Sequence, residues 1–157
     1  MTTLFTKADD EAQIRAQIDE WTNAARVKDV DRVMSHYAPD VVAFDAIWQL
    51  RFEGVEAYRK HWKACLAMCE GPMIIEIHDL DITVREDVAF CHYLSRCGGT
   101  GPDGKEQTGW MRATVCLHKT NGKWMIVHEH FSAPFDPENG KALLNLEPAP
   151  VQRSSPA

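Results

Sequence analysis

The sequence is poor in the features that mark membrane and nucleic-acid-binding proteins. No stretch approaches the roughly 18 consecutive apolar residues of a membrane span. Basic runs are missing too: 17 Lys and Arg residues stand against 23 Asp and Glu residues, for a formal net charge of −6. Nucleic-acid and anionic-membrane surfaces both require clustered Lys and Arg side chains. We therefore expect neither kind of partner, and expect the protein to bind a small molecule instead.

Motifs with a well-defined chemistry are also scarce. There is no glycine-rich phosphate loop, serine-centred nucleophile elbow or kinase signature, and we expect no cofactor. Residues 1–10 lack the charged start and long apolar run of a signal peptide. The cysteines form an odd set without the spacing of a small secreted domain: Cys65, Cys69, Cys91, Cys97 and Cys116. The simplest interpretation is a cytoplasmic protein with reduced thiols.

What the sequence does have is enough apolar material for one domain with a real core. It contains 157 residues, of which 45% are hydrophobic. Ile14, Ile18, Trp21 and Ala25 recur at spacings of four, three and four, which predicts a helix with one buried stripe.

Two shorter helices are predicted after the first. Asp29 can cap one of them, and Pro39 closes it. The buried face of this helix would be Val30, Val33, Met34 and Tyr37. A short strand over residues 41–44 then precedes a third helix, roughly residues 55–69.

Patterns of period two follow the helices. Four β-rich runs, at residues 73–84, 88–97, 107–119 and 123–132, are separated by turn residues. Helices first and strands afterwards predict an α+β fold, with an antiparallel sheet covered on one face by helices. We assign residues 1–9 to an extension, 10–134 to the domain, and 135–157 to a loose, proline-rich tail with a docked turn at 142–144.

The last hairpin of this sheet places one carboxylate inside. With residues 120–122 as a three-residue loop, Val115 faces Val127 and Ala113 faces Glu129. The inner face is then almost wholly apolar, and Glu129 is its exception. An unpaired buried carboxylate is costly or raises its pKa. Glu129 is therefore either paired structurally or kept for function.

The opposite face of the hairpin carries side chains that would be exposed to solvent if no partner covered them. Trp124, Ile126, His128 and Cys116 are placed there. This arrangement predicts a homodimer through the outer face of the sheet.

The strand before this hairpin offers partners for the buried carboxylate. Val88, Phe90, His92, Leu94 and Arg96 share one face of residues 88–97. If that face points inward, Arg96 can neutralise Glu129 and His92 can titrate near neutral pH. The alternative is that His92 and Arg96 are rim residues that point to solvent.

Two His/Cys groupings raise the question of a metal. His128 and His130 lie on one strand face, and His61, Cys65 and Cys69 fall at helical i, i+4 and i+8 positions. For the first pair a dimer interface or solvent is the favoured interpretation, and for the second set helix packing is. We predict no metal site.

Two segments resemble the nuclear-transport-factor-2-like superfamily, which includes ketosteroid isomerase, SnoaL-like polyketide cyclases and the association domain of calcium/calmodulin-dependent kinase II. They are residues 29–45 (DVDRVMSHYAPDVVAFD) and residues 121–134 (NGKWMIVHEHFSAP). The order of helices and strands over about residues 10–134 is similar as well. The resemblance implies a cone-shaped fold, in which a curved antiparallel sheet wraps around three N-terminal helices and encloses an apolar pocket. It does not specify a reaction, because one scaffold hosts many functions.

The resemblance also carries over individual positions. The general-base aspartate of ketosteroid isomerase falls on Asp45, the acidic residue of the SnoaL-like cyclases falls on Glu129, and a pocket arginine of the kinase association domain falls near Arg96. The two oxyanion donors of the isomerase fall on Trp21 and in residues 113–115, where no acid stands. This incomplete donor pair argues against steroid isomerisation itself.

Two functional hypotheses follow. In the first, the protein is a cofactor-independent isomerase, cyclase or lyase in which Asp45 or Glu129 removes a proton next to a carbonyl and His92 or Arg96 stabilises the enolate. In the second, it is a non-catalytic ligand-binding or oligomerisation module that holds a small anion through Arg96. The residues expected to line the pocket are Trp21, Tyr37, Trp62, Arg96 and Phe131. The expected ligand is a small hydrophobic molecule with a carbonyl or carboxylate group.

Overall fold

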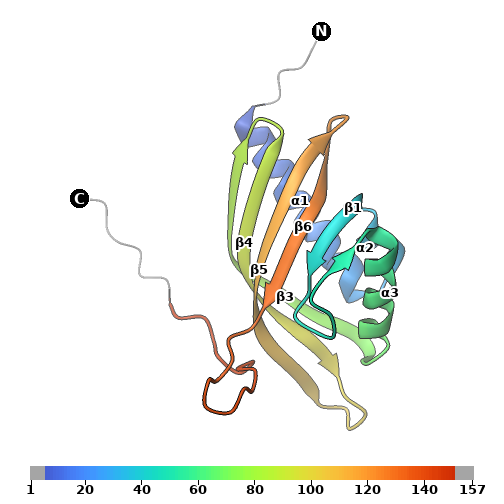
Figure 1. The fold of residues 1–157 in the computed structure, drawn as a ribbon, viewed down its shortest axis with the longest axis vertical. Coiled ribbons are helices and arrows are strands. Elements are labelled where there is room, and N and C mark those ends of the chain that lie inside the picture. Colours follow the sequence, from blue (N-terminus) through green and yellow to red (C-terminus); the bar gives the residue numbers. More distant parts are fainter. Residues whose placement is uncertain (1–5, 151–157) are drawn as a thin grey trace, which may run out of the picture.

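The structure is a computed structural model that describes residues 6–150. Its elements, in chain order, are α1 (Lys7–Arg26), α2 (Val30–Met34), β1 (Tyr37–Phe44), β2 (Phe52–Glu53), α3 (Val55–Leu66), β3 (Glu70–Arg85), β4 (Val88–Thr100), β5 (Glu106–Thr120) and β6 (Lys123–Ser132). Figure 1 shows the long strands β3 to β6 as one twisted sheet, with α1 running behind it and with α2 and α3 beside β1. No helix within residues 6–150 is long and apolar enough to cross a bilayer.

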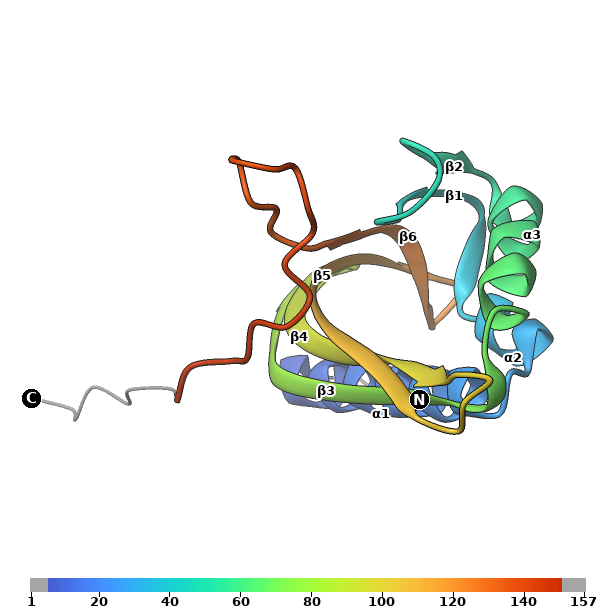
Figure 2. The same cartoon turned by 90° about the horizontal axis from the view of Figure 1, so that it is seen from below.

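Helix α1 begins at a capping box. The Thr6 hydroxyl accepts a hydrogen bond from the Asp9 backbone N–H, and the Asp9 carboxylate accepts one from the Thr6 N–H. The predicted stripe is buried, with Ile14 and Trp21 at 0% and 6% exposure. Figure 2 shows α1 lying along the concave side of the sheet, against β3.

Helix α2 is shorter than predicted. Asp29 caps it as expected, by accepting from the Arg32 N–H at 3.1 Å. The helix nevertheless ends at Met34, and Tyr37 opens β1 instead of extending the helical face. The His36 carbonyl accepts from the Ile126 N–H of β6 at 2.9 Å, so pairing with a strand replaces the helical turn. Helix α3 also ends early, at Leu66.

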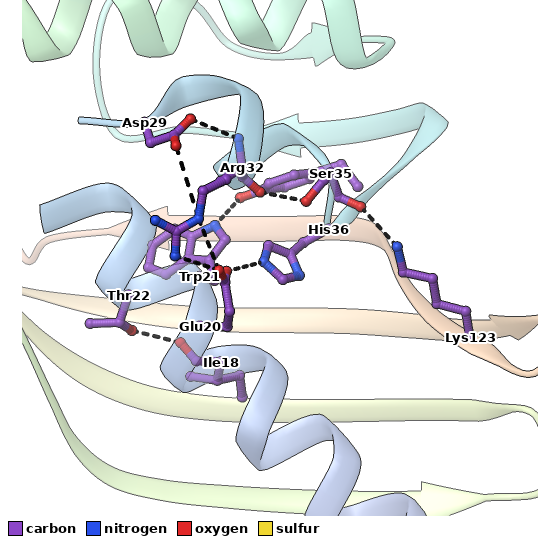
Figure 3. Close-up of polar contacts among 10 residues, drawn as sticks. Ile18, Glu20, Trp21, Thr22, Asp29, Arg32, Ser35, His36 and Lys123 are labelled. Carbon is purple, nitrogen blue, oxygen red and sulfur yellow. Dashed lines mark hydrogen bonds and ion pairs between the residues drawn. The ribbon is translucent and has the colours of Figure 1, made fainter. Parts of the chain in front are cut away.

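A polar contact joins the α2 segment to α1. Figure 3 shows the Glu20 carboxylate of α1 between Arg32 and His36, which are donors from the chain that follows. The Arg32 Nε lies 3.0 Å and the His36 Nε2 lies 2.8 Å from Glu20 oxygens. These donors lower the pKa of Glu20, Arg32 being the larger cause. The contact fixes the start of β1 relative to α1.

The sheet has the strand order β2-β1-β6-β5-β4-β3. Strands β3 to β6 form the antiparallel meander that the turn residues predict. The expectation of a wholly antiparallel sheet is corrected at one position, because β1 runs parallel to β6. The meander leaves the far edge of β6 open, and β1 occupies it, which brings Ala43 opposite Glu129.

The last hairpin differs from its prediction in the turn and in β6. Thr120 pairs with Lys123, so the loop contains only residues 121–122 and the predicted three-residue loop at 120–122 is wrong. Trp124 and Ile126 therefore point inward, at 2% and 5% exposure, and their predicted outer position is wrong.

A β-bulge follows in β6, where Val127 is an extra residue between the partners of Cys116 and Leu117. The bulge leaves Glu129 inside, at 1% exposure. Its cross-strand partner is Val115, where Ala113 was predicted.

The proline-rich C-terminal segment folds back on the outer side of the sheet (Figure 1, red). The Leu143 N–H donates to the Pro134 carbonyl at 2.7 Å, and the Trp110 N–H of β5 donates to the Leu144 carbonyl at 2.8 Å. The expected docked turn at residues 142–144 is therefore present. It lies next to a hollow of about 160 Å³ beside Leu94 and Trp110.

Asp10 ties α1 to the last hairpin. Its carboxylate accepts from the Lys119 ammonium at 2.6 Å and from the Trp124 indole N–H at 3.1 Å, and the residue is 7% exposed. We predict that Asp10→Ala lowers the free energy of unfolding by about 2 kcal/mol, because it leaves a buried donor and a partly buried cation without this acceptor. Urea denaturation at pH 7 measures the change. Glu11→Ala, which breaks an exposed ion pair with Arg15 at 3.5 Å, should cost less than about 0.5 kcal/mol; equal losses would contradict the role given to Asp10.

Candidate functional site

The centre of the candidate site is a buried carboxyl group between two tyrosine hydroxyls. Glu129 of β6 lies with both carboxyl oxygens 2.9 Å from the Tyr37 hydroxyl of β1. Its Oε1 lies 2.5 Å from the Tyr58 hydroxyl of α3. The Trp21 indole N–H of α1 donates to the Tyr37 oxygen at 2.9 Å. Four elements thus converge on one carboxyl group.

A second carboxyl group continues this contact toward the surface. Asp45, directly after β1, places Oδ2 3.1 Å from the Tyr58 hydroxyl and 3.1 Å from Nε2 of His61. Tyr58 and His61 are three residues apart on α3, so they share one helix face. The His61 side chain is 3% exposed and that of Asp45 is 16% exposed. Among residues 6–150, no side chain or backbone group donates to the other oxygen of Asp45, Oδ1.

Burial sets the protonation states at the centre of the site. It raises the pKa of Glu129 to about 8, with the Asp45 charge adding to the rise and the two tyrosines opposing it. Burial, followed by the nearby Glu129, also raises the pKa of Tyr37 and of Tyr58 well above the usual tyrosine value. Both phenols therefore stay protonated at neutral pH and act as hydrogen-bond donors.

The nearest thiol is not a nucleophile. Cys65 Sγ lies 3.5 Å from Nε2 of His61, but burial raises the pKa of Cys65 to about 12, with Asp45 as a smaller cause. The thiol is therefore neutral at pH 7, and thiolate chemistry does not fit this site.

The space around the site differs from the expected pocket. Between α1 and the sheet, beside Trp21 and Glu129, side chains leave a cavity of only about 10 Å³. A larger hollow of about 450 Å³ lies at the loop that follows β1, lined by residues 44–50 and His130. Asp45 borders this hollow, so it is the member of the site that a ligand reaches first.

The loop beside the hollow covers His61. The Trp48 ring lies edge-on to the His61 ring, with centroids 5.7 Å apart. Trp48 has a backbone φ of 68° and is 62% exposed, while Leu50 is 96% exposed. A positive φ is uncommon for a bulky residue and marks local strain.

The predicted pocket residues divide into those near the site and those away from it. Trp21 and Tyr37 contact the buried centre directly. Trp62 packs edge-on against Trp21 at 5.4 Å, and its indole N–H is buried without an acceptor among the described residues. Phe131 is partly buried against the core. Ligand binding by these residues stays a prediction.

His92 and Arg96 lie on the outer side of β4, which is the alternative that the sequence left open, and not on the inner face. The inner face of β4 is formed by Ala89, Cys91, Tyr93 and Ser95. Arg96 pairs on the outside with Glu76 at 2.9 Å and Glu106 at 3.5 Å, and the exposed His92 lies 3.9 Å from Asp81. Both faces of β4 carry apolar residues, so the alternation of the sequence alone does not decide which face is buried.

Tyr58 and His61 are the site residues that sequence reasoning missed. The sequence pattern assigns Tyr58 no functional role, and it considers His61 only with Cys65 and Cys69 as a possible metal grouping. The usable signal was their spacing of three on one helix, one turn from its N-terminus.

The His and Cys groupings of the sequence do not form a metal centre among residues 6–150. Within residues 6–150, no group of three or more His, Cys, Asp or Glu side chains could hold a metal ion. His128 is engaged with the backbone, its Nδ1 lying 2.6 Å from the Val42 carbonyl oxygen.

Known structures share this architecture. A protein of unknown function from Pseudomonas putida KT2440, described as nuclear-transport-factor-2-like, is 44% identical over 92% of this chain and 100% of its own, with a TM-score of 0.84. A protein of that family from Streptomyces avermitilis, provisionally assigned as a dehydratase, is 18% identical over 81% of this chain and 97% of its own, with a TM-score of 0.72. A Xanthomonas campestris protein, provisionally assigned as a calcium/calmodulin-dependent protein kinase II association domain, is 22% identical over 88% and 94%, with a TM-score of 0.69. The last two likenesses show the fold alone.

The chain therefore has the nuclear-transport-factor-2-like fold that the sequence resemblance implied. The family model of the SnoaL-like domain matches residues 14–136, and the protein belongs to this family. Comparison with curated protein sequences gives no match.

Proposed function

We propose that the protein is a cofactor-independent isomerase, cyclase or lyase in which Asp45 removes a proton from a carbon next to a carbonyl group. The observation that carries this proposal is the state of the Asp45 carboxylate. Oδ2 is held by Tyr58 and His61 at 3.1 Å each, while Oδ1 has no partner among residues 6–150. The same side chain borders the hollow of about 450 Å³.

This arrangement suits a general base. Two hydrogen bonds to Oδ2 fix the orientation of the carboxylate, so that Oδ1 keeps one direction toward a bound molecule. Proton removal moves the hydrogen of the substrate C–H bond to Oδ1, and the bonding electrons delocalise onto the carbonyl oxygen as an enolate. Return of the proton to another carbon is isomerisation, expulsion of a β-substituent is elimination, and attack on a second carbonyl is cyclisation.

The alternative of an anion-binding module is weaker in this structure. That hypothesis assigned the ligand to Arg96, which instead pairs with Glu76 and Glu106 on the outer face of the sheet. An enolate-stabilising role for Arg96 or His92 loses its support for the same reason. The homodimer remains a proposal; Phe44 and Phe90, at 38% and 47% exposure, are side chains that such an interface would cover.

Solvent exchange tests the proposal without knowledge of the natural substrate. A panel of small ketones, 1,3-dicarbonyl compounds and β-hydroxy carbonyl compounds is incubated with the protein in D₂O and followed by NMR, with a metal chelator present. We expect catalysed deuterium incorporation next to the carbonyl, or loss of the β-hydroxyl group, for a subset of the panel. Arg96→Ala should match the wild type, because its side chain lies outside the site. Compounds that bind saturably with no exchange or elimination would instead support a binding module.

A further inference from the structure

One hydroxyl group bridges the two carboxyl groups of the site. The Tyr58 oxygen lies 2.5 Å from Oε1 of Glu129 and 3.1 Å from Oδ2 of Asp45. A phenol has a single hydrogen, so it can donate in only one of these contacts and must accept in the other. A carboxyl group can donate only when it is protonated. The geometry therefore requires one proton on one of the two carboxyl groups.

The surroundings place this proton on Glu129. Glu129 is 1% exposed, and within residues 6–150 no cation contacts it. Asp45 is closer to solvent and faces the His61 ring, which can supply an N–H to its Oδ2. Removal of a carboxylate from water disfavours its charge, and this cost is larger at the deeper position.

The rest of the chain of hydrogen bonds agrees with this assignment. An indole N–H can only donate, so Tyr37 accepts from Trp21 and must use its own hydrogen toward Glu129. A neutral Glu129 then accepts on one oxygen and donates from the other. In this arrangement each neighbouring pair of side chains from Trp21 through Tyr37, Glu129 and Tyr58 to Asp45 shares one hydrogen bond with a donor on one side and an acceptor on the other.

We propose that Glu129 is a neutral carboxylic acid at neutral pH, which donates to Tyr58 and thereby directs the Tyr58 hydroxyl onto Oδ2 of Asp45. Glu129 is then a positioning residue that acts through Tyr58, not a group that contacts the substrate. Its effect on the orientation of Asp45 bears on catalysis only if the proposed function holds. The location of the proton does not depend on that function.

The groups around Glu129 set the pH at which it loses its proton. The titratable side chains that face or influence it are Tyr37 of β1, Asp45 after β1, Tyr58 of α3, and Cys91 and Tyr93 of β4, while α1 presents the non-titrating Gln17 and Trp21. Because burial raises the pKa of Glu129 to about 8, the proton is lost as the pH rises through that value. The Tyr58 hydroxyl would then turn toward Glu129 and leave Asp45.

Infrared difference spectroscopy of the full chain tests the proton directly. At pH 6 the wild type should show the carbonyl stretch of one protonated carboxylic acid, and this band should disappear as the pH is raised above about 8. Glu129→Gln should remove the band, whereas Asp45→Asn should keep it. Tyr58→Phe should shift the band, because the acid O–H loses its acceptor.

Several outcomes would overturn the inference. A wild type without the band at pH 6, or a band that survives in Glu129→Gln and vanishes in Asp45→Asn, would place the proton elsewhere. An unshifted band in Tyr58→Phe would remove the relay. If Glu129→Gln does not fold, the wild-type pH series and Asp45→Asn still decide the location. None of these spectra requires turnover, so a failure of the proposed function would appear separately, in the exchange assay.

Discussion

Glu129→Gln should abolish a pH dependence of stability that the wild type shows. In the wild type we expect the free energy of unfolding to fall by about 5 kcal/mol as the pH rises from 4.5 to about 8. In the unfolded chain Glu129 ionises near its ordinary pKa of 4.5, whereas in the folded protein burial raises the pKa to about 8. Between these values the folded state binds one more proton than the unfolded state, so the free energy of unfolding falls as the pH rises. Each unit of difference between the folded and the unfolded pKa is worth about 1.4 kcal/mol, so the difference between about 8 and 4.5 gives about 5 kcal/mol.

The sign of this effect distinguishes Glu129 from an ordinary carboxylate. The stability contributed by the neutral acid is fully present below pH 4.5 and is lost as the pH approaches 8. A paired, ionised carboxylate would show the opposite trend. Gln is neutral at every pH and can keep one acceptor toward Tyr37 and one donor toward Tyr58. The free energy of unfolding of Glu129→Gln relative to wild type should therefore increase steadily with pH.

Urea denaturation of both proteins at pH 5, 6, 7 and 8 measures the difference. Glu53→Gln is the matched control, because the Glu53 side chain is 63% exposed and its replacement should leave the pH dependence of wild type unchanged within about 0.5 kcal/mol. Parallel curves for wild type and Glu129→Gln would show that Glu129 has the same charge in both states, and would contradict its assignment as a neutral acid.

The largest effect on activity is expected at Asp45. Asp45→Asn retains the size of the side chain but removes the oxygen that would take the substrate proton. Positioned general bases contribute roughly 10²- to 10⁴-fold to rate, so kcat for any compound turned over in the exchange assay should fall by about that factor. The free energy of unfolding should change little, because the amide oxygen of the introduced asparagine can still accept from Tyr58 or His61.

Variants of Tyr58 and His61, the two residues that hold Oδ2 of Asp45, should have smaller effects on kcat. Tyr58→Phe and His61→Phe each remove one of the two contacts at Oδ2, and each should reduce kcat by less than Asp45→Asn does, because the base itself remains. Steady-state kinetics with one turned-over compound compares the three variants. An Asp45→Asn protein that retains wild-type kcat would exclude Asp45 as the base.

The fold could be predicted from the sequence because several local patterns agreed. Helical periodicity around Ile14 and Trp21, turn residues at 120–122 and the two family-like segments all point to one architecture. Glu129 was found because it interrupts an apolar face, and Asp45 because its spacing from Tyr37 matches the family's base. Both observations depend on short stretches of chain whose geometry is regular.

The remaining errors have physical causes. A two-residue turn in place of the predicted three-residue loop puts Trp124 and Ile126 on the inner face, and one extra residue at Val127 then keeps Glu129 inside. A bulge leaves no mark in the composition of a strand. The sequence left open which face of β4 is buried, because apolar residues occupy both of its faces. His61 was missed because its partner, Asp45, is brought to it by the path of the loop after β1 and not by sequence proximity.

A crystal structure of Asp45→Asn with a compound that the wild type turns over would test the central claim most directly. The substitution slows the chemistry and so retains the bound molecule. We expect the acidic carbon within about 3.5 Å of the residue-45 side chain, in the hollow at residues 44–50, with Tyr58 and His61 still on the opposite oxygen. A compound bound away from residue 45, with Trp48 still covering His61, would contradict Asp45 as the base.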